Sequence, residues 1–485
     1  MLAPGTLVLA QAGAEVHEVE ELVPGEIGLF QQVASAQVCH GSILVRPSCN
    51  RGLLLAGGTR QRKTSSCLAG HMVVTMSVIS PELDPADAGF DRARLESIGQ
   101  HFERYVEALK IPGFLVVVTR WGKVAYVGCG GFRDLENGAP VEADTRFRIY
   151  SMTKPVTSVA AMICYEEGLI ALDDPLSKFI PEFGDIRVFA GGSPIQPVTV
   201  PTSEPIRIWH LMTHTAGLTY GWMSNHPVDA MYRSAGFEWD PPPGLDLAAC
   251  CSRLAQIPLR CQPGSQWNYS MATDVLGRVV EVATDQPLEE FFAERVFGPL
   301  GMKETSFYVT GEEVEKLAAL YMPDLFTGRA TRATHMGESV LSRPRAPSGG
   351  GGLVSTAADY HRFTQMLLRH GELDGARILG SRTVAYMTRN HLPGGTDMAS
   401  FSSLIGGEDE LGLGFGLGFS VVIDPAARKV TCSVGEYGWG GAASTEFWVD
   451  PAEALTVLFF TQLLPSGTHP IRRELHQLVY SAIVD

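Results

Sequence analysis

The 485-residue sequence has no apolar run long enough to cross a membrane. A span needs about 18 consecutive apolar residues, whereas the longest candidate, around Phe114 to Val118, has the length of a strand. Lys/Arg-rich runs are also missing, and the formal net charge is -15. Because this charge repels phosphate backbones, nucleic acid is a poor candidate partner. The sequence therefore predicts a soluble protein without a membrane span.

The nine cysteines form no Cys-x-x-Cys pair, so neither a zinc ribbon nor a redox motif is indicated. Leu7 to Ala10 is a short apolar run with no Lys or Arg before it, which does not fit a secretory signal. We expect reduced thiols in a cytoplasmic enzyme. Residues 1–75 are rich in Gly, Ala, Val and Ser and show little periodicity. They predict a weakly structured N-terminal extension, or an upstream start that the working protein does not use, before one domain over 76–485.

Regular patterns begin near residue 88. The spacing predicts an amphipathic helix over 90–109, whose apolar stripe is Leu95, Ile98, Phe102, Val106 and Leu109. A strand hairpin is expected over 114–119 and 123–127. A further helix is expected after Ser151, ending near Gly168.

The second half of the chain mixes both element types. Residues from about 185 to 345 are rich in Pro and helical patterns, and predict an inserted, mostly helical lobe. Further helices are expected over 356–370 and 470–484, and strands over 412–418, 429–433, 443–449 and 455–460. Strands at both ends with helices between them predict an α/β fold, in which an antiparallel sheet assembled from distant segments is flanked by helices.

Ser151-Met152-Thr153-Lys154 is the strongest chemical signal. Positions i and i+3 share a helix face, so the Ser151 hydroxyl and the Lys154 amine can meet. Serine is a weak nucleophile until a neighbouring base takes its proton. Of the eight lysines, Lys154 alone has a serine three residues before it. Taken by itself, the pattern fits an ordinary helix start capped by Ser151 equally well.

Tyr269-Ser270 follows Pro263-Gly264 and opens a helical run. A tyrosine at such a turn can project into a cleft, but its reference pKa of about 10 makes it a poor base without a nearby cation. Lys154 can supply that cation. Taken by itself, Tyr269 is more readily explained as a packing residue.

Trp439-Gly440-Gly441-Ala442 precedes the strand expected over 443–449. Glycines beside a strand allow a substrate to approach the backbone closely, and a free N–H at the strand edge can stabilise an oxyanion. A tight bend explains the two glycines equally well.

Together the three motifs resemble the serine beta-lactamase and penicillin-binding-protein superfamily, and most closely its esterase branch, the family VIII carboxylesterases. The resemblance extends over about residues 85 to 480 and therefore covers most of the chain. It includes supporting segments at 166–175, 210–218, 268–277 and 298–302. The joint match is far more specific than any single motif, and it implies a beta-lactamase-like fold.

The resemblance also implies roles for these residues. Ser151 attacks the acyl carbonyl, Lys154 and Tyr269 share the base role, and Tyr269 protonates the leaving alkoxide. The N–H groups of Ser151 and Ala442 form the oxyanion hole. Trp439, Gly440 and Gly441 line the substrate site. No cofactor or metal is implied.

Two departures from the family pattern separate its branches. Beta-lactamases of this fold carry Lys-Thr-Gly on the active-site strand, whose cation receives the substrate carboxylate. Here Trp439-Gly440-Gly441 stands in its place. Met271 stands where the lactamase tyrosine motif ends in Asn. Both changes favour small neutral esters, and weak hydrolysis of beta-lactams stays open because the acylation groups are shared.

Other sites find less support in the sequence. No Gly-x-Ser-x-Gly elbow of an α/β-hydrolase occurs. His210 and His214 have metal-ligand spacing, but Leu211 stands where a metalloprotease has Glu, so a structural role is favoured. The main hypothesis is a short-chain carboxylesterase. The alternatives are a beta-lactamase or D-amino-acid peptidase, and a catalytically silent penicillin-sensing or scaffold module. The oligomeric state is left open.

Overall fold

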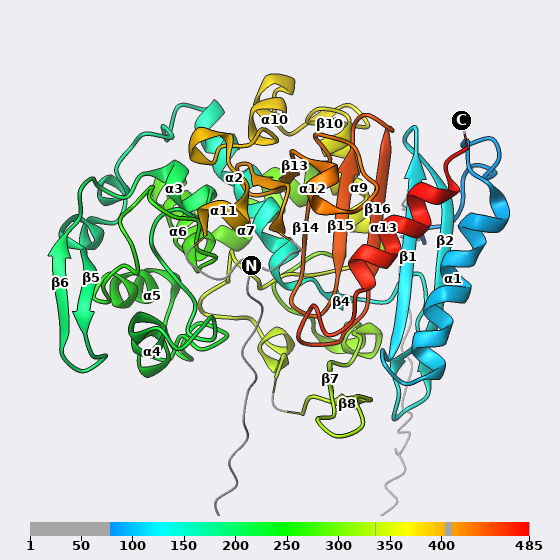
Figure 1. The fold of residues 1–485 in the computed structure, drawn as a ribbon, viewed down its shortest axis with the longest axis horizontal. Coiled ribbons are helices and arrows are strands. Elements are labelled where there is room, and N and C mark those ends of the chain that lie inside the picture. Colours follow the sequence, from blue (N-terminus) through cyan, green and yellow to red (C-terminus); the bar gives the residue numbers. More distant parts are fainter. Residues whose placement is uncertain (1–77, 335, 403–409, 485) are drawn as a thin grey trace, which may run out of the picture. The chain divides into compact units, whose positions relative to one another are not determined.

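The computed structural model describes residues 78–334, 336–402 and 410–484, and its fold is drawn in Figure 1. The extension predicted over residues 1–75 lies outside these ranges. The central feature is an eight-stranded antiparallel sheet in the order β12-β13-β14-β15-β16-β1-β2-β3. Its strands are β12 (Leu413–Phe415), β13 (Ser420–Val422), β14 (Tyr437–Gly440), β15 (Glu446–Asp450), β16 (Leu455–Phe460), β1 (Gly113–Arg120), β2 (Lys123–Asp134) and β3 (Ala139–Pro140).

Strand β1 is buried along its whole length because both of its faces are covered. Leu115 and Val117 belong to the core cluster that contains α2 (Thr153–Glu166) and α9 (Ala357–Leu368). Val116 and Val118 belong to a separate cluster with the terminal helices α1 (Arg92–Glu107) and α13 (Ile471–Ala482). Figure 1 shows α13 in front of the strands and α1 beside β2. The antiparallel sheet flanked by helices, predicted from the sequence, is confirmed.

The lobe expected over 185–345 holds helices and two short strand pairs. Its helices are α3 (Ile208–Met212), α4 (Pro227–Ser234), α5 (Leu247–Leu254), α6 (Ala272–Thr284), α7 (Leu288–Phe292) and α8 (Gly298–Leu300). Its strands pair as β5 (Arg187–Gly192) with β6 (Pro197–Pro201) and as β7 (Tyr321–Pro323) with β8 (Ala330–Arg332). Helix α6 of the lobe packs on α2, and residues of both helices belong to the same hydrophobic core.

The remaining elements are short. They include α10 (Ser381–Met387), α11 (Met398–Phe401) and α12 (Pro425–Arg428), the pair β10 (Glu372–Leu373) and β11 (Ala376–Arg377), and the pair β4 (Phe147–Arg148) and β9 (Val354–Ser355). Strand β4 lies directly before Ser151. It therefore joins the sheet region to the segment with the strongest chemical signal.

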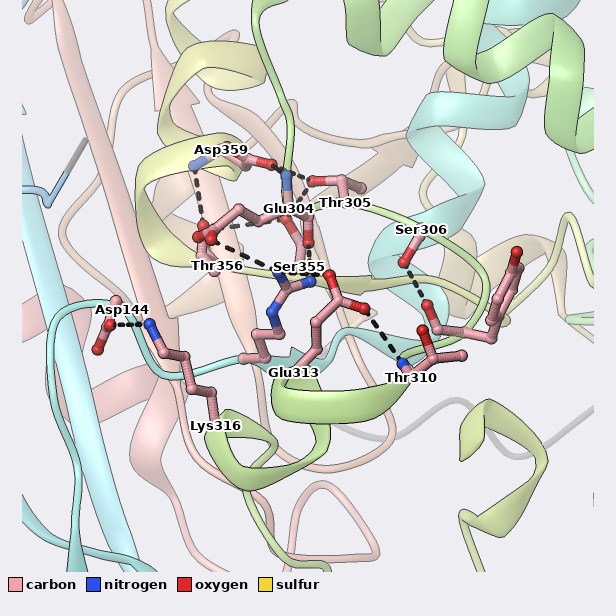
Figure 2. Close-up of polar contacts among 12 residues, drawn as sticks. Asp144, Glu304, Thr305, Ser306, Thr310, Glu313, Lys316, Ser355, Thr356 and Asp359 are labelled. Atoms are coloured by element: carbon pink, nitrogen blue, oxygen red, sulfur yellow. Dashed lines mark hydrogen bonds and ion pairs between the residues drawn. The ribbon is translucent and has the colours of Figure 1, made fainter. Parts of the chain in front are cut away.

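A buried polar network fixes the chain just before β4 (Figure 2). The Arg146 guanidinium forms ion pairs with Glu304 at 3.4 Å and Glu313 at 3.0 Å. Asp359, in the first turn of α9, accepts hydrogen bonds from the Glu304 N–H at 2.7 Å and the Thr305 hydroxyl at 2.9 Å. Burial raises the pKa of Asp359 to about 6. The network ties α9, the lobe and the approach to Ser151 together.

Several sequence-based boundaries were wrong. The helix expected to reach Leu109 ends at Glu107, and Leu109 adopts the left-handed conformation, with φ 54°. Residues 429–433 are not a strand. Asp424 caps α12 by accepting from the N–H groups of Ala426 and Ala427, and the next strand is β14. Lys429 ends α12 in the left-handed conformation, with φ 57°, so the backbone is not extended at the first residue of the expected strand.

Two other strands are shorter than expected. The strand expected over 443–449 begins only at Glu446, because Ser444 donates its N–H back to the Gly441 carbonyl in a turn. Within 412–418 the strand covers Leu413–Phe415, and the chain then turns at Gly418, whose φ is 96°. The backbone packs closely at this turn, because a Cβ on Gly418 would lie 2.2 Å from the Ser158 hydroxyl.

Candidate active site

Ser151 lies in a tight turn between β4 and α2. Tyr150, Ser151 and Met152 form a single 3-10 turn, and α2 begins at Thr153. Tyr150 has φ 43°, a left-handed conformation that a bulky side chain rarely adopts. The Met152 carbonyl accepts a hydrogen bond of 2.8 Å from the Tyr360 hydroxyl. A strained turn held by a buried partner presents the Ser151 hydroxyl at the start of the helix.

Lys154 lies one turn further along, with 2% of its surface exposed. Its Nζ donates to the Ser151 Oγ at 3.3 Å, to the Tyr220 hydroxyl at 2.9 Å and to the Gly350 carbonyl at 2.7 Å. An ammonium has three N–H groups, and these three acceptors match them. The predicted meeting of Ser151 and Lys154 is therefore seen in the structure.

Tyr269 comes from the turn before α6, 118 residues after Ser151. Its hydroxyl donates to the Ser151 Oγ at 2.6 Å. Its ring lies 4.6 Å from the Lys154 Nζ, measured to the centroid. Ser151, Lys154 and Tyr269, predicted from separate motifs, are thus brought together around one hydroxyl.

Aromatic side chains surround Tyr269. The ring of His214 lies 4.9 Å away and that of Trp439 5.6 Å away, between centroids. The Trp439 indole N–H points to the Tyr269 hydroxyl over 3.5 Å, a long hydrogen bond. Burial, together with the nearby charge of Lys154, places the pKa of His214 well below its usual value. His214 is therefore a neutral packing partner of the tyrosine at neutral pH.

Asp274 positions Gly350, whose carbonyl accepts a hydrogen bond from Lys154. It lies in the first turn of α6 and accepts hydrogen bonds from the Ser348 hydroxyl at 2.5 Å and the Gly350 N–H at 3.1 Å. A Cβ on Gly350 would lie 2.4 Å from the Asp274 carboxylate, so only glycine fits. Burial raises the pKa of Asp274, while the charge of Lys154 opposes this shift. Asp274 thus holds the carbonyl that receives the lysine.

Ala442 lies on the other side of Ser151, in the turn between β14 and β15. Both residues line one cavity of about 270 Å³. A Cβ on Gly441 would lie 2.5 Å from the Ile149 carbonyl and 2.2 Å from the Thr445 hydroxyl. The missing side chain lets the turn approach the backbone just before Ser151. This placement fits the oxyanion-hole role that the resemblance implies for the Ser151 and Ala442 N–H groups.

The structure separates the other residues expected at the substrate site. Trp439 and Gly440 line a neighbouring cavity of about 520 Å³, on the side of α13. A Cβ on Gly440 would lie 2.0 Å from the Arg472 guanidinium. Trp439 therefore influences Ser151 indirectly, through its ring contact with Tyr269. Gly441 influences the position of Ser151 because its turn packs closely against the Ile149 carbonyl.

The two histidines with metal-ligand spacing do not share a helix face. Helix α3 ends at Met212, and His214 follows with φ 55°. The His210 Nδ1 accepts a hydrogen bond of 3.0 Å from the Arg207 N–H. In the described ranges no group of three or more His, Cys, Asp or Glu residues could hold a metal ion. Likewise, no helix of these ranges is long and apolar enough to cross a membrane.

Sequence reasoning missed several contributors to the site. Tyr220 contacts Lys154 directly, and the Gly350 carbonyl is its closest acceptor. The Gly349 to Gly352 run was visible in the sequence, but its link to Asp274 depends on the fold. Trp222 and Trp239 also line the cavity. No local pattern signals these residues, because their proximity arises from the lobe.

The model of the family described as "Beta-lactamase" matches residues 98–481. This chain belongs to the beta-lactamase family. An uncharacterized protein of Mycobacterium tuberculosis is 38% identical over 360 residues, covering 73% of this chain and 86% of its own length. "Esterase EstB" of Burkholderia gladioli is 31% identical, covering 84% of this chain and 100% of its own length.

Solved structures agree with this membership of the beta-lactamase family. The structure of "EstCE1, a hydrolase with promiscuous acyltransferase activity" has a TM-score of 0.67 and 28% identity, covering 80% of this chain and 98% of the other. Simvastatin synthase (LovD) from Aspergillus terreus has a TM-score of 0.68 and 25% identity, covering 81% of this chain and 98% of the other. The chain is a serine hydrolase of the beta-lactamase family with homologues among esterases and acyltransferases.

Proposed function

We propose that this protein is a carboxylesterase that hydrolyses short-chain carboxylic esters through an acyl-serine intermediate. The observation that carries the proposal is the convergence of two activating groups on one hydroxyl. Tyr269 lies 2.6 Å and Lys154 3.3 Å from the Ser151 Oγ. A serine with a base and a second polar group within hydrogen-bonding reach has the arrangement of an activated nucleophile.

The proposed reaction has two halves. In the first, the Ser151 Oγ attacks the ester carbonyl, its proton passes to the Lys154–Tyr269 pair, and Tyr269 returns a proton to the leaving alkoxide. The N–H groups of Ser151 and Ala442 stabilise the oxyanion. In the second half, water activated by the same pair attacks the acyl group. The Ser151 bond to the acyl carbon breaks, and the carboxylic acid is released.

The charge of the cavity favours esters over beta-lactams. Its lining includes the carboxylates of Asp240 and Glu338, and Lys, Arg and His are missing from its described lining residues. The carboxylate of a beta-lactam has no cationic partner there. The names of the relatives, EstB and EstCE1, add support from homologous chains.

Acyl transfer to an alcohol is a second candidate function. It uses the same acyl-serine intermediate and replaces water with an alcohol in the second half. The support for it is the similarity to EstCE1 and to the "Monacolin J acid methylbutanoyltransferase" of Aspergillus terreus, which is 27% identical over 79% of this chain. Adding an alcohol during ester turnover distinguishes the two, because transfer yields a new ester in place of acid.

The proposal is tested with p-nitrophenyl esters of increasing acyl length beside nitrocefin. We expect turnover of the acetate and butyrate, weak or no turnover of nitrocefin, and loss of both in Ser151→Ala with its circular dichroism unchanged. Nitrocefin hydrolysed in preference to every ester would instead make the protein a beta-lactamase. Ester turnover that survives in Ser151→Ala would contradict the proposed nucleophile.

A further inference from the structure

Three aromatic side chains form one wall of the cavity beside Ser151. Tyr220 stacks on Trp222 with a centroid distance of 5.2 Å and an interplanar angle of 22°. Trp222 stacks on Trp239 at 5.3 Å and 13°. The two indoles are 38% and 41% exposed and line the cavity. Large aromatic surface left open beside a nucleophile is available for contact with a ligand.

The aromatic wall begins at Tyr220, which lies next to Tyr269, the proposed proton donor. The ring of Tyr220 is 5.3 Å from that of Tyr269, between centroids, and the Tyr220 hydroxyl accepts from Lys154. Tyr269 is the group proposed to protonate the leaving alkoxide. An ester that is attacked by Ser151 therefore places its alcohol part along the aromatic wall.

The same cavity is acidic at the outer end of the aromatic wall. Asp240 follows Trp239 directly, and Glu338 enters from another segment, and both are exposed. Neither carboxylate forms a salt bridge with any residue of the described ranges. Lys154, the one lysine that contacts Ser151 in the part of the chain that the structure describes, has its three N–H groups engaged. The formal net charge of -15 adds to a negative potential around the cavity.

We infer that the cavity selects esters whose alcohol part carries a positively charged ammonium group, a conclusion that rests on the proposed esterase function. The ammonium lies against the faces of Trp222 and Trp239, where cation–π attraction acts. Asp240 and Glu338 supply the opposite charge. The reaction is otherwise unchanged. The Ser151 Oγ bonds to the acyl carbon, the ester C–O bond breaks, and the alcohol leaves with its ammonium group and with a proton from Tyr269 on its oxygen. Water later releases the acid from Ser151.

The test compares choline butyrate with 3,3-dimethylbutyl butyrate, which replaces the trimethylammonium group by a neutral tert-butyl group of the same shape. At low ionic strength we expect kcat/KM for the choline ester to be higher by about threefold to thirtyfold. Raising NaCl to about 0.5 M shrinks this preference, because salt screens exposed charges. Turnover of p-nitrophenyl butyrate is measured alongside.

Matched variants identify the source of the preference. Asp240→Asn combined with Glu338→Gln brings the ratio of the two kcat/KM values toward one, and so does Trp239→Leu. Glu312→Gln combined with Glu315→Gln removes the same two charges from exposed positions outside the cavity and leaves the ratio unchanged.

Three results overturn the inference. Equal turnover of the two esters by the unmodified protein shows an apolar subsite without charge selection. Failure to hydrolyse the choline ester while p-nitrophenyl butyrate is turned over rejects the amino-alcohol ester class and leaves the esterase proposal standing. Absence of turnover of all three esters contradicts the esterase proposal itself, and the inference with it.

Discussion

Two side chains from distant parts of the chain converge on the Ser151 hydroxyl. Both Tyr269 and Lys154 donate hydrogen bonds to it. The ammonium is in turn held by the Tyr220 hydroxyl and the Gly350 carbonyl. The serine oxygen therefore accepts two hydrogen bonds in the resting arrangement. Its activation requires one of the two groups to take the serine proton.

Replacing Tyr269 by Phe tests its part in proton transfer. The change removes one oxygen and keeps the ring contacts with His214 and Trp439. We expect kcat for p-nitrophenyl butyrate to fall by about 10² to 10⁴, the usual contribution of a general acid or base. KM and the thermal midpoint should change little. Steady-state kinetics and calorimetry measure both.

Tyr220→Phe is the matched control. It removes a hydroxyl that accepts a hydrogen bond from Lys154 and that forms none with Ser151, both residues lying in the described ranges. We expect a smaller fall in kcat than for Tyr269→Phe. An equal fall in both variants would mean that the tyrosines act through the position of Lys154, and that Tyr269 transfers no proton.

The residues of the site could be predicted from the sequence only where the chemistry is local. Ser151 and Lys154 share a helix turn, so their spacing alone predicted the contact. Tyr269 needed the family resemblance, since it lies 118 positions away from Ser151. Asp274 lies in the supporting segment 268–277, but the resemblance gave it no role, and Tyr220 gave no signal. Their contribution depends on packing between the lobe and α2, which a one-dimensional pattern does not contain.

At the scale of elements, the turn between β14 and β15 packs closely against the segment that leads into α2. Gly441 lies in the β14–β15 turn, and its Cα hydrogen faces the Ile149 carbonyl. Ile149 comes two residues before Ser151. The position of the Ala442 N–H relative to the nucleophile therefore depends on this close approach.

Gly441→Ala tests that dependence. Because a Cβ would lie 2.5 Å from the Ile149 carbonyl, the turn and the helix start must separate. We expect a loss of about 1–3 kcal/mol in unfolding free energy and a fall in kcat of about 10² or more, as for loss of one oxyanion donor. Denaturant unfolding and ester kinetics measure the two effects.

Gly184→Ala is the control, because its Cβ would meet no atom nearer than 3.6 Å and its φ is not left-handed. Unaltered activity in Gly441→Ala would show that the turn does not set the oxyanion site.

Elements were predictable where periodicity and burial agree. The stripe of Leu95, Ile98 and Phe102 is buried in α1 as expected. The prediction over 429–433 failed because its alternating residues are not buried and a capped helix ends there. The strands expected over 412–418 and 443–449 were also predicted too long. Turns with positive φ at Gly418 and Ser444 limit them, and these turns depend on tertiary contacts.

At the scale of the whole molecule, buried neutral histidines link stability to pH. Burial lowers the pKa of His210 from 6.5 to about 4. Above pH 6.5 the folded and unfolded states both hold this residue neutral. Between pH 6.5 and 4 the unfolded state binds a proton that the folded state does not. Stability therefore decreases as pH falls through this window.

His210→Asn removes the titration and keeps an acceptor for the Arg207 N–H. We expect the loss of unfolding free energy between pH 7 and pH 4 to be smaller in the variant, by at most about 3 kcal/mol. Urea unfolding at a series of pH values measures it. An identical pH profile in both proteins would show that His210 titrates normally in the folded state.

The central claim, that Ser151 is the acylated nucleophile, is tested most directly by labelling with a fluorophosphonate and mapping the adduct by peptide mass spectrometry. We predict one adduct on the peptide that contains Ser151, absent in Ser151→Ala and strongly reduced in Lys154→Met. An adduct on a different serine, or labelling that persists in Ser151→Ala, would contradict the account.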